Sequence, residues 1–388
     1  MSKPSKYLVN FDYTVLFVFL GLSVIGLIVH LDMSPERSLF IFYKQLTWSL
    51  ISLVGMMFCF FFVKAEFLRK YIYPLLGIIT VLLIYVLVNP HEVNGARRII
   101  PIGPMNFQPS LFARIFLIIF IADQLDKKSK LLPNITLKKF IIEFKEILIA
   151  IGVIYILILA EKHLSILMIL TLVIFSLLWI AKLKFSTWTL LIGLLLLLAL
   201  AGGGVKSLIS SKRDTEYRGK RMKVYTQYSL LTRAMGIKPS NYKGSEQDQV
   251  RESLIALSTG KMFGLGLGNG IAKNYFLSES RTDYIFSIIG EEFGFFGGLV
   301  VIVLYLILFW RIIVISSKID DTFLRLTVLG LGLNLFFNAI VNIGVNISTL
   351  PSTGVTLPFI SYGGTSFLIN SLALGIILGI SAKWKVRG

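Results

Sequence analysis

The stretch DYIFSIIGEEFGFFGGLVVIVLYLILFWRIIVI, residues 283–315, decides the fold class of this chain. Roughly 20 apolar residues cross the ~30 Å of a bilayer's hydrocarbon, so the run predicts a transmembrane helix. It is too long for one perpendicular span. We expect its first turns to project above the hydrocarbon or to lie along the interface. Asp283 then sits near the headgroup level, where a carboxylate stays ionised, and ionisable groups at such places are functional candidates.

The composition extends this interpretation to the whole chain. Of its 388 residues, 55% are hydrophobic and only 15% are charged, and the mean hydropathy is +0.78. These values predict a polytopic membrane protein. Cys59 is the single cysteine and the three histidines are scattered, so neither a disulfide framework nor a metal cluster is indicated. The net charge of +18 is better explained by topology-setting loop residues than by nucleic-acid binding.

Hydropathy divides the chain into ten spans. The predicted class is therefore an all-α polytopic membrane protein that forms a single domain over residues 1–388. The first span is too long for a signal-peptide core and lacks a small-residue cleavage site, so we expect it to be retained. The ten spans are Tyr13–Leu31, Ile41–Val63, Tyr71–Asn89, Ser110–Asp123, Ile141–Ala160, Leu164–Ala181, Phe185–Val205, Tyr284–Ile315, Phe323–Ile347 and Pro358–Ala382.

Loop charge orients these spans. Lysine and arginine concentrate in alternate loops, which places both termini in the cytoplasm, provided that the short fourth span is real. Residues 206–282 then form one long external loop between the seventh and eighth spans, and this loop is also basic. Two explanations remain open for that charge: attraction to anionic headgroups, or binding of a phosphorylated substrate.

Glycine recurs within this loop in the stretch GKMFGLGLGNG, residues 260–270. A nucleotide-binding loop would need a strand before it and a helix after it, and no βαβ pattern surrounds these glycines. A close-packed turn is the better prediction. The two halves of the chain show no convincing internal repeat, which argues against a transporter built from inverted repeats.

Helical spacing suggests a face for Asp283. On a helix that starts at this residue, Gly290, Gly294 and Gly297 share its face, where small residues admit a neighbouring helix. Glu292 points almost opposite and is the weaker candidate.

The ninth span carries asparagines at every fourth position, which form a polar seam on one helix face: Asn334, Asn338, Asn342 and Asn346. Interhelical hydrogen bonding is the favoured role for the inner pair. For the outer pair, substrate contact is equally favoured.

Arg114 lies one turn inside the fourth span, after Ser110, a candidate N-cap. A helix N-terminus and an arginine together make an anion site, and snorkelling of Arg114 to the interface is an equal alternative. Arg97 and Arg98 precede it in the same external loop.

Four sequence blocks resemble the SEDS family (shape, elongation, division and sporulation) of the FtsW/RodA type. The resemblance covers nearly the whole chain, and the ending of the chain is closer to the division type, FtsW, than to RodA. The blocks are NGARR at 94–98 with FQPS at 107–110, GLGLG at 264–268, RTDYIFSIIGEEFG at 281–294, and NIG at 342–344 through LPSTG at 350–354 to LPFISYGG at 357–364.

The resemblance implies a ten-span peptidoglycan glycosyltransferase of the bacterial cytoplasmic membrane. Such proteins polymerise lipid II, an undecaprenyl-pyrophosphate-linked disaccharide peptide. Their partners are a class B penicillin-binding protein and other divisome or elongasome membrane proteins. The family's essential aspartate matches Asp283. Lipid II is α-linked and the polymer is β-linked, so the transfer inverts and needs a base for the attacking hydroxyl. Charge neutralisation of the pyrophosphate could come from basic residues or from a divalent cation, Mg²⁺ or Mn²⁺.

The substrate-binding candidates are Arg97, Arg98, Arg114, Asn342, Ser361, Tyr362 and Gly363. The chain departs from the family at Glu161-Lys162-His163-Leu164-Ser165, where the acid and proline of the usual turn are missing, so no role is assigned there. A lipid II flippase is the alternative function and an unrelated solute transporter is a more distant one. Transporters place their sites at the bilayer midplane, whereas Asp283 is expected at the rim.

Overall fold

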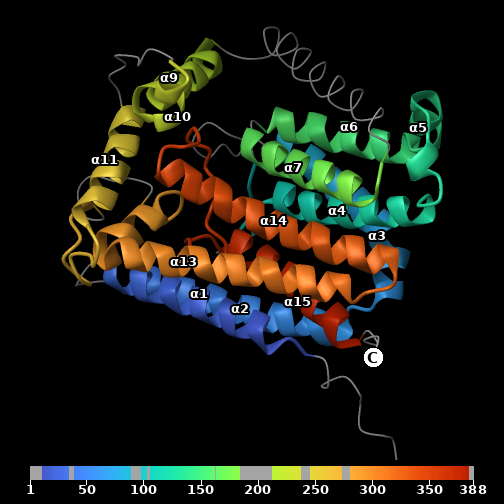
Figure 1. The fold of residues 1–388 in the computed structure, drawn as a ribbon, viewed down its shortest axis with the longest axis horizontal. Helices are drawn as coiled ribbons and strands as arrows, with labels where there is room; N and C mark the ends of the chain where they lie inside the picture. Colours follow the sequence, from blue (N-terminus) through green and yellow to red (C-terminus); the bar gives the residue numbers. More distant parts are fainter. Residues whose placement is uncertain are drawn as a thin grey trace, which may run out of the picture.

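The computed structural model describes residues 11–34, 39–88, 98–102, 105–161, 163–183, 212–236, 245–272 and 280–383. Within these ranges the chain is helical apart from one short β-hairpin, in agreement with the predicted class (Figure 1). The elements are α1 (Tyr13–Asp32), α2 (Phe40–Phe62), α3 (Ala65–Val88), β1 (Ile100–Ile102), β2 (Met105–Phe107), α4 (Pro109–Lys127), η2 (Leu132–Asn134), α5 (Leu137–Glu143), α6 (Lys145–Ala160), α7 (Leu164–Ile180), α9 (Lys212–Tyr228), α10 (Leu230–Ala234), α11 (Ser245–Thr259), α13 (Ile285–Ser317), α14 (Thr322–Asn346) and α15 (Gly364–Lys383).

Six of the described helices are long and apolar enough to cross a membrane: α1, α2, α3, α13, α14 and α15. The fourth and sixth predicted spans are the helices α4 and α7, and the fifth is divided at Phe144 into α5 and α6. The seventh predicted span, Phe185–Val205, lies outside the described residues. The tenth begins later than predicted, because residues 358–363 form a turn in which Phe359 has a φ of 66°.

Helix α14 occupies the centre of the bundle and packs on α13, α15, α4 and α7. Its glycines make this packing close. A Cβ atom on Gly330 would lie 2.5 Å from the Ile118 side chain, and one on Gly332 would lie 2.5 Å from Ile312. Small residues allow helix backbones to approach in this way inside membranes. The asparagine seam therefore faces protein on a buried helix.

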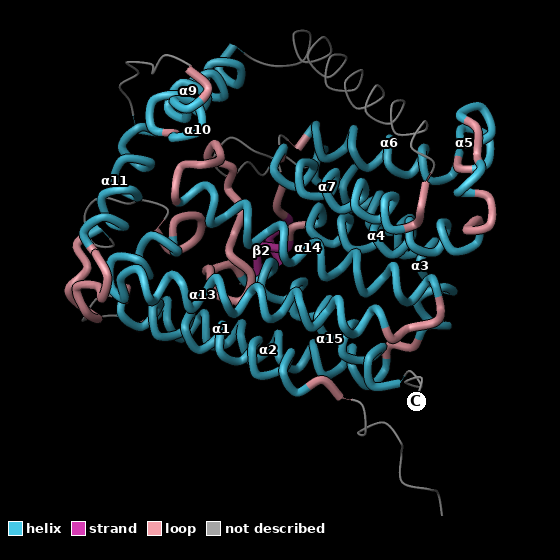
Figure 2. Tube along the Cα trace, viewed as in Figure 1, coloured by secondary structure: helices cyan, strands magenta, loops and turns pink. Residues whose placement is uncertain are grey.

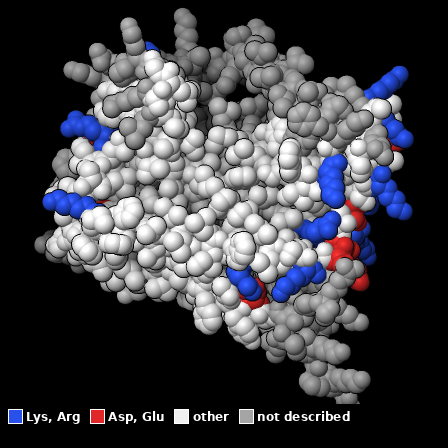
Figure 3. Space-filling view, in the orientation of Figure 1, with Lys and Arg blue, Asp and Glu red and all other residues white. Residues whose placement is uncertain are grey.

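The bundle has two distinct ends. Helices α9, α10 and α11 gather at one end, which we call the loop end (Figures 1 and 2). Ion pairs tie the helices near the opposite end: Arg69 contacts Asp126 at 2.6 Å and Asp321 at 3.4 Å, and Arg311 contacts Asp12 at 2.7 Å. On the face drawn in Figure 3, charged side chains gather towards the two ends and leave a broad uncharged band between them. This is the surface of a multi-pass membrane protein.

Candidate active site

Helix α13 is a hairpin of two helices that turns at Gly294, where φ is 68° and ψ is −164°. A Cβ atom on Gly298 would lie 3.2 Å from the Phe286 ring, and one on Gly297 would lie 3.6 Å from the Ile289 carbonyl oxygen. Twelve residues of a continuous helix would separate Phe286 from Gly298 by about 18 Å. The segment 285–293 therefore folds back along the segment 295–317, and these 33 residues are not one straight span.

The glycine-rich stretch 260–270 closes this helix break. It supplies donors to the last carbonyls of the first helix and acceptors to the first amides of the second, which are the groups that a helix end leaves unpaired. A Cβ atom on Gly264 would lie 2.0 Å from the Glu292 carbonyl oxygen, and Gly264 has a φ of 82°, so this position requires glycine. The prediction of a close-packed turn is confirmed. The four hydrogen bonds are Leu265 N to Glu291 O at 3.0 Å, Gly266 N to Glu292 O at 3.0 Å, Phe295 N to Lys261 O at 2.9 Å and Phe296 N to Met262 O at 3.3 Å.

Asp283 lies in the turn that leads into α13, and other elements hold its backbone. The Asp283 carbonyl oxygen accepts hydrogen bonds from Asn342 Nδ2 at 2.9 Å and from Asn346 Nδ2 at 2.8 Å. The Thr282 carbonyl accepts from the Ser361 hydroxyl at 2.6 Å. Asp283 is a partly exposed residue, and its carboxylate lies beside Gly354, where a Cβ atom would come within 3.5 Å of the Oδ2 atom. Hydrogen bonds thus hold the backbone of the Asp283 turn, while the residue itself remains partly exposed.

The predicted glycine face is wrong. Asp283 precedes the helix, whose N-cap is Tyr284, and Gly294 is the point at which the helix breaks. Gly297 then belongs to the second helix of the hairpin. The face rested on an uninterrupted 3.6-residue repeat, and the positive φ of Gly294 ends that repeat.

The asparagine seam brings Arg114 to the same side of α14 as Asp283. Arg114 Nη1 donates to Asn338 Oδ1 at 3.1 Å, one helical turn from Asn342. Four residues of helix rise about 6 Å, so the arginine and the acid are held by successive turns. Arg114 is only 2% exposed, which rules out snorkelling. The interhelical role expected for the inner asparagines is confirmed at Asn338.

A second polar cluster forms around the atypical turn after α6. The Glu161 side chain is fully buried, and among the described residues neither of its oxygens has a well-formed hydrogen bond. Burial raises the pKa of Glu161 to about 8, while the facing Ser110 hydroxyl and the Arg98 guanidinium lower it. Burial also lowers the pKa of His163 to about 3, an effect reinforced by Arg98 and Arg114. Sequence reasoning left this turn without a role, yet it faces two of the candidate arginines.

The segment 349–355 links this turn, the loop end and Asp283. The Ser165 hydroxyl donates to the Thr353 carbonyl, next to the Gly354 that borders the carboxylate. From α9, Arg221 Nη1 donates to Ser352 O at 3.0 Å and the Tyr225 hydroxyl donates to Thr349 O at 3.0 Å. Sequence reasoning missed Ser165, Arg221 and Tyr225. Only the general excess of basic residues in the loop pointed towards Arg221.

The remaining candidates differ in their surroundings. Asn342 is 1% exposed, and it donates to the Asp283 and Val355 carbonyls. Ser361 is also buried, and it accepts from Leu357 N at 2.7 Å. Tyr362 and Gly363 are partly exposed in the same turn. Arg97 lies outside the described residues.

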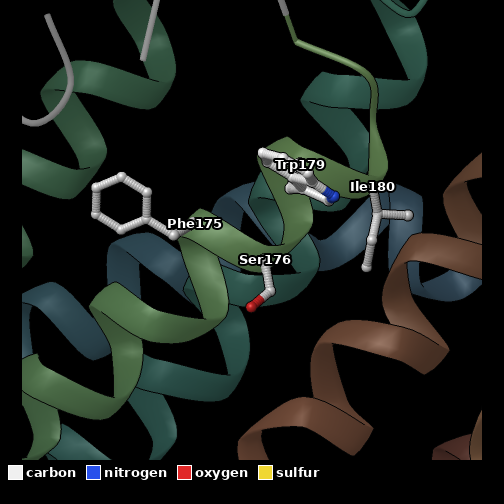
Figure 4. Close-up of a pocket in the computed structure, with 4 residues that line it drawn as sticks. All are labelled: Phe175, Ser176, Trp179 and Ile180. Carbon is white, nitrogen blue, oxygen red and sulfur yellow. The ribbon is translucent and has the colours of Figure 1, made fainter. Parts of the chain in front are cut away.

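No three His, Cys, Asp or Glu side chains converge within the described ranges. A groove of about 360 Å³ is lined by four residues of α7: Phe175, Ser176, Trp179 and Ile180 (Figure 4). It includes none of the residues that hold Asp283. The candidate site is therefore the polar region around Asp283, Arg114 and the segment 349–355.

The chain is similar in sequence to relatives of known name. The chain is 33% identical to a probable peptidoglycan glycosyltransferase FtsW of Allochromatium vinosum over 296 residues, which are 76% of this chain and 68% of that protein. It is 30% identical to a protein of the same description from Trichlorobacter lovleyi over 398 residues, with 100% and 97% covered.

Solved structures share the fold. A chain from the structure "Structural coordination of polymerization and crosslinking by a peptidoglycan synthase complex" superposes with a TM-score of 0.73 at 23% identity, covering 96% of this chain and 98% of that one. The rod shape determining protein RodA of Thermus thermophilus superposes with a TM-score of 0.68 at 22% identity, covering 96% and 97%. The family model of the FtsW, RodA and SpoVE group, described as "Cell cycle protein", matches residues 8–386. The chain therefore belongs to this SEDS family of the bacterial inner membrane, and the two relatives from Allochromatium vinosum and Trichlorobacter lovleyi are of the FtsW type.

Proposed function

We propose that this protein is a peptidoglycan glycosyltransferase that polymerises lipid II, with Asp283 as its base. The observation that carries the proposal is the way Asp283 is held. Two asparagines of α14 fix its backbone carbonyl, and the residue stays partly exposed. Arg114 of α4 is held by Asn338, one turn along α14 from Asn342. Positioned acids and cations of this kind suit a reaction that moves a proton and releases an anion.

The proposed step is an inverting transfer. Asp283 accepts the proton of the acceptor sugar's 4-hydroxyl as that oxygen attacks the anomeric carbon of the donor. The bond between this carbon and the pyrophosphate oxygen breaks, and its electron pair leaves with the undecaprenyl pyrophosphate. The new bond is β because attack occurs opposite the α-linked leaving group. The proton on Asp283 then passes to water.

In this proposal the arginines neutralise the negative charge of the pyrophosphate leaving group. Pyrophosphate is a stable anion, so it needs charge neutralisation more than it needs a proton. Arg98 acts on both Glu161 and His163, and Arg114 acts on His163, which supports a cluster of positive charge beside the segment 349–355. Arg97, Tyr362 and Gly363 complete the proposed substrate contacts. Asn342 and Ser361 contribute through the backbone of the catalytic turn.

The proposed topology has ten spans with both termini in the cytoplasm, so the loop end faces outward and lipid II is used on the outer face. A class B penicillin-binding protein is the proposed transpeptidase partner, within a wider set of divisome or elongasome membrane proteins. The similar solved structure, a peptidoglycan synthase complex that coordinates polymerization and crosslinking, supports such a pairing by analogy.

The test compares lipid II polymerisation by the full chain, purified with its penicillin-binding partner, for wild type, Asp283→Asn and Asp283→Ala. We expect both variants to lose activity by at least about a hundredfold. Asp320→Asn is the matched control, because this exposed acid lies between α13 and α14 near the opposite end, and it should polymerise normally. Full polymerisation by both Asp283 variants would refute the base assignment. Lipid II movement across proteoliposomes without polymerisation would favour a flippase.

A further inference from the structure

A buried hydrogen-bond network joins the loop helix α11 to the catalytic turn. Its members are Ser253 of α11, Ser287 of α13 and Asn346 of α14, and all three side chains are fully buried. The Ser253 and Ser287 hydroxyl oxygens lie 2.6 Å apart, and Ser253 Oγ donates to the Asn346 carbonyl at 2.9 Å. Neither serine was singled out from the sequence as a site residue, and Asn346 was considered only as one of the outer asparagines of the seam.

Proton accounting fixes the orientation of the Asn346 side-chain amide in this network. The Ser287 backbone N–H can only donate, so the Asn346 side-chain atom 2.9 Å away from it is the oxygen. The Asn346 amide nitrogen must then face the opposite way, towards the carbonyls of Asp283 at 2.8 Å and Asn342 at 2.9 Å. The Ser287 hydroxyl oxygen lies 2.8 Å from the same Asn346 oxygen and 2.6 Å from Ser253 Oγ, so its single proton goes to one of these two acceptors. Both arrangements join Ser253, Ser287 and Asn346.

The serines of α11 differ in how they use their hydroxyls. Ser258 is exposed and bonds the Ile255 carbonyl of its own helix at 2.8 Å, which is the usual local arrangement. Ser253 instead bonds two other helices. Backbone packing holds it there, since a Cβ atom on Gly260 would lie 1.9 Å from the Gly290 carbonyl oxygen and one on Gly290 would lie 2.4 Å from Leu257.

We propose that Asn346 is a positioning residue for Asp283 and that Ser253 of the loop helix α11 clamps it through Ser287. The proposal rests on Asp283 being the catalytic base, and it makes the placement of α11 part of the active site. Loss of the clamp leaves the substrate-binding groups unchanged but lets the Asp283 turn shift. The effect should therefore appear in kcat rather than in KM.

The kinetic test uses Ser253→Ala in the full chain with its partner, with Ser258→Ala as the control on the same helix. We expect Ser253→Ala to lower kcat by about five- to tenfold, the equivalent of one hydrogen bond, with KM unchanged within about twofold. Its melting temperature should fall only slightly, because one buried hydrogen bond is lost, and Ser258→Ala should be unaffected in every respect. Unchanged kcat in Ser253→Ala, or an equal loss in Ser258→Ala, would overturn the clamp.

The isosteric variant Asn346→Asp is a sharper probe. It keeps the oxygen that faces Ser287 but replaces the amide donor with an oxygen aimed at two carbonyls. We expect it to lose more activity than Ser253→Ala, and retention of full activity would contradict the network. Ser253→Ala keeps the proposal testable should Asn346→Asp fail to fold.

A labelling experiment separates this inference from the assignment of the base. The rate at which a membrane-impermeant maleimide modifies Asp283→Cys reports the position of the turn without any catalysis, and the native Cys59 is buried. Adding Ser253→Ala should change that rate by at least about threefold, because thiol reactivity follows exposure and local charge. An unchanged rate would overturn the positioning role. A changed rate with an active Asp283→Asn enzyme would retain the clamp and reject the base.

Discussion

The fold buries the positive charge of Arg114, and we expect this charge to contribute to catalysis. A buried guanidinium with one described partner, Asn338, keeps capacity to bind an anion. We expect Arg114→Gln to lower kcat/KM for lipid II polymerisation by about a hundredfold, comparable to the loss of an electrostatic donor at a developing charge. Arg114→Lys, which keeps the charge, should retain most of the activity.

The control for Arg114 is Lys130→Gln, an exposed basic residue just beyond α4, which should behave as wild type. Steady-state kinetics at fixed salt measures all three variants. If Arg114→Gln and Arg114→Lys were equally impaired, packing rather than charge would explain the effect.

Glu161 gives the molecule a pH-dependent stability. Its folded-state pKa of about 8 lies above its ordinary value of 4.5, so the folded protein holds this proton more tightly. Stability is full below the ordinary pKa and falls as pH rises from about 4.5 to about 8, by at most about 1.4 kcal/mol for each pH unit. Glu161→Gln removes the titration. Thermal melting should show Glu161→Gln and wild type alike near pH 4.5, with the variant more stable at pH 8. A constant gap across this range would contradict the assignment.

At the level of elements, the glycine-rich stretch 260–270 and the break in α13 form one structural unit. The stretch caps both helices of the hairpin, and the first helix leads back to Asp283. An intact cap is therefore needed both for stability and for the placement of the acid.

Gly264→Ala tests this unit. The added methyl would strain a left-handed residue and overlap the Glu292 carbonyl, so we expect a destabilisation of at least about 1–3 kcal/mol together with lower polymerase activity. Gly77→Ala in α3 meets nothing within 4 Å and should be neutral or slightly stabilising. Thermal melting in detergent measures both. A Gly264→Ala protein as stable as Gly77→Ala would show that the loop does not brace the hairpin.

At the scale of the whole molecule, the ten-span topology predicts which side of the membrane each loop faces. Lys138 in α5 and Lys261 in the glycine-rich stretch are both exposed and belong to predicted inside and outside segments. In intact cells or spheroplasts, an impermeant maleimide should label Lys261→Cys and should label Lys138→Cys only after the membrane is opened. The buried Cys59 gives a low background. Labelling of Lys138→Cys from outside would reject the ten-span arrangement and the cytoplasmic termini.

The sequence by itself determined the membrane class, the place of most helices and the family. Hydropathy is a sum over neighbouring residues, and α1, α2 and α14 begin and end within two residues of the predicted limits. The motif around Asp283 was likewise recognised from the sequence alone. The prediction failed where a helical repeat was extended too far. The hydropathy of residues 283–315 does not show that Gly294 has a non-helical backbone, and this residue divides the predicted helix into two.

Only the tertiary structure decided how the acid is held. Asn342 and Asn346 lie 59 and 63 positions from Asp283 in the chain, and Ser253 reaches Asn346 across 93. Hydrogen bonds over such separations follow from helix packing, which no local pattern specifies. The role of Glu161 emerged in the same way. An acid in a short turn is unremarkable in sequence, and it becomes a perturbed, buried group only when α4 and α7 close over it.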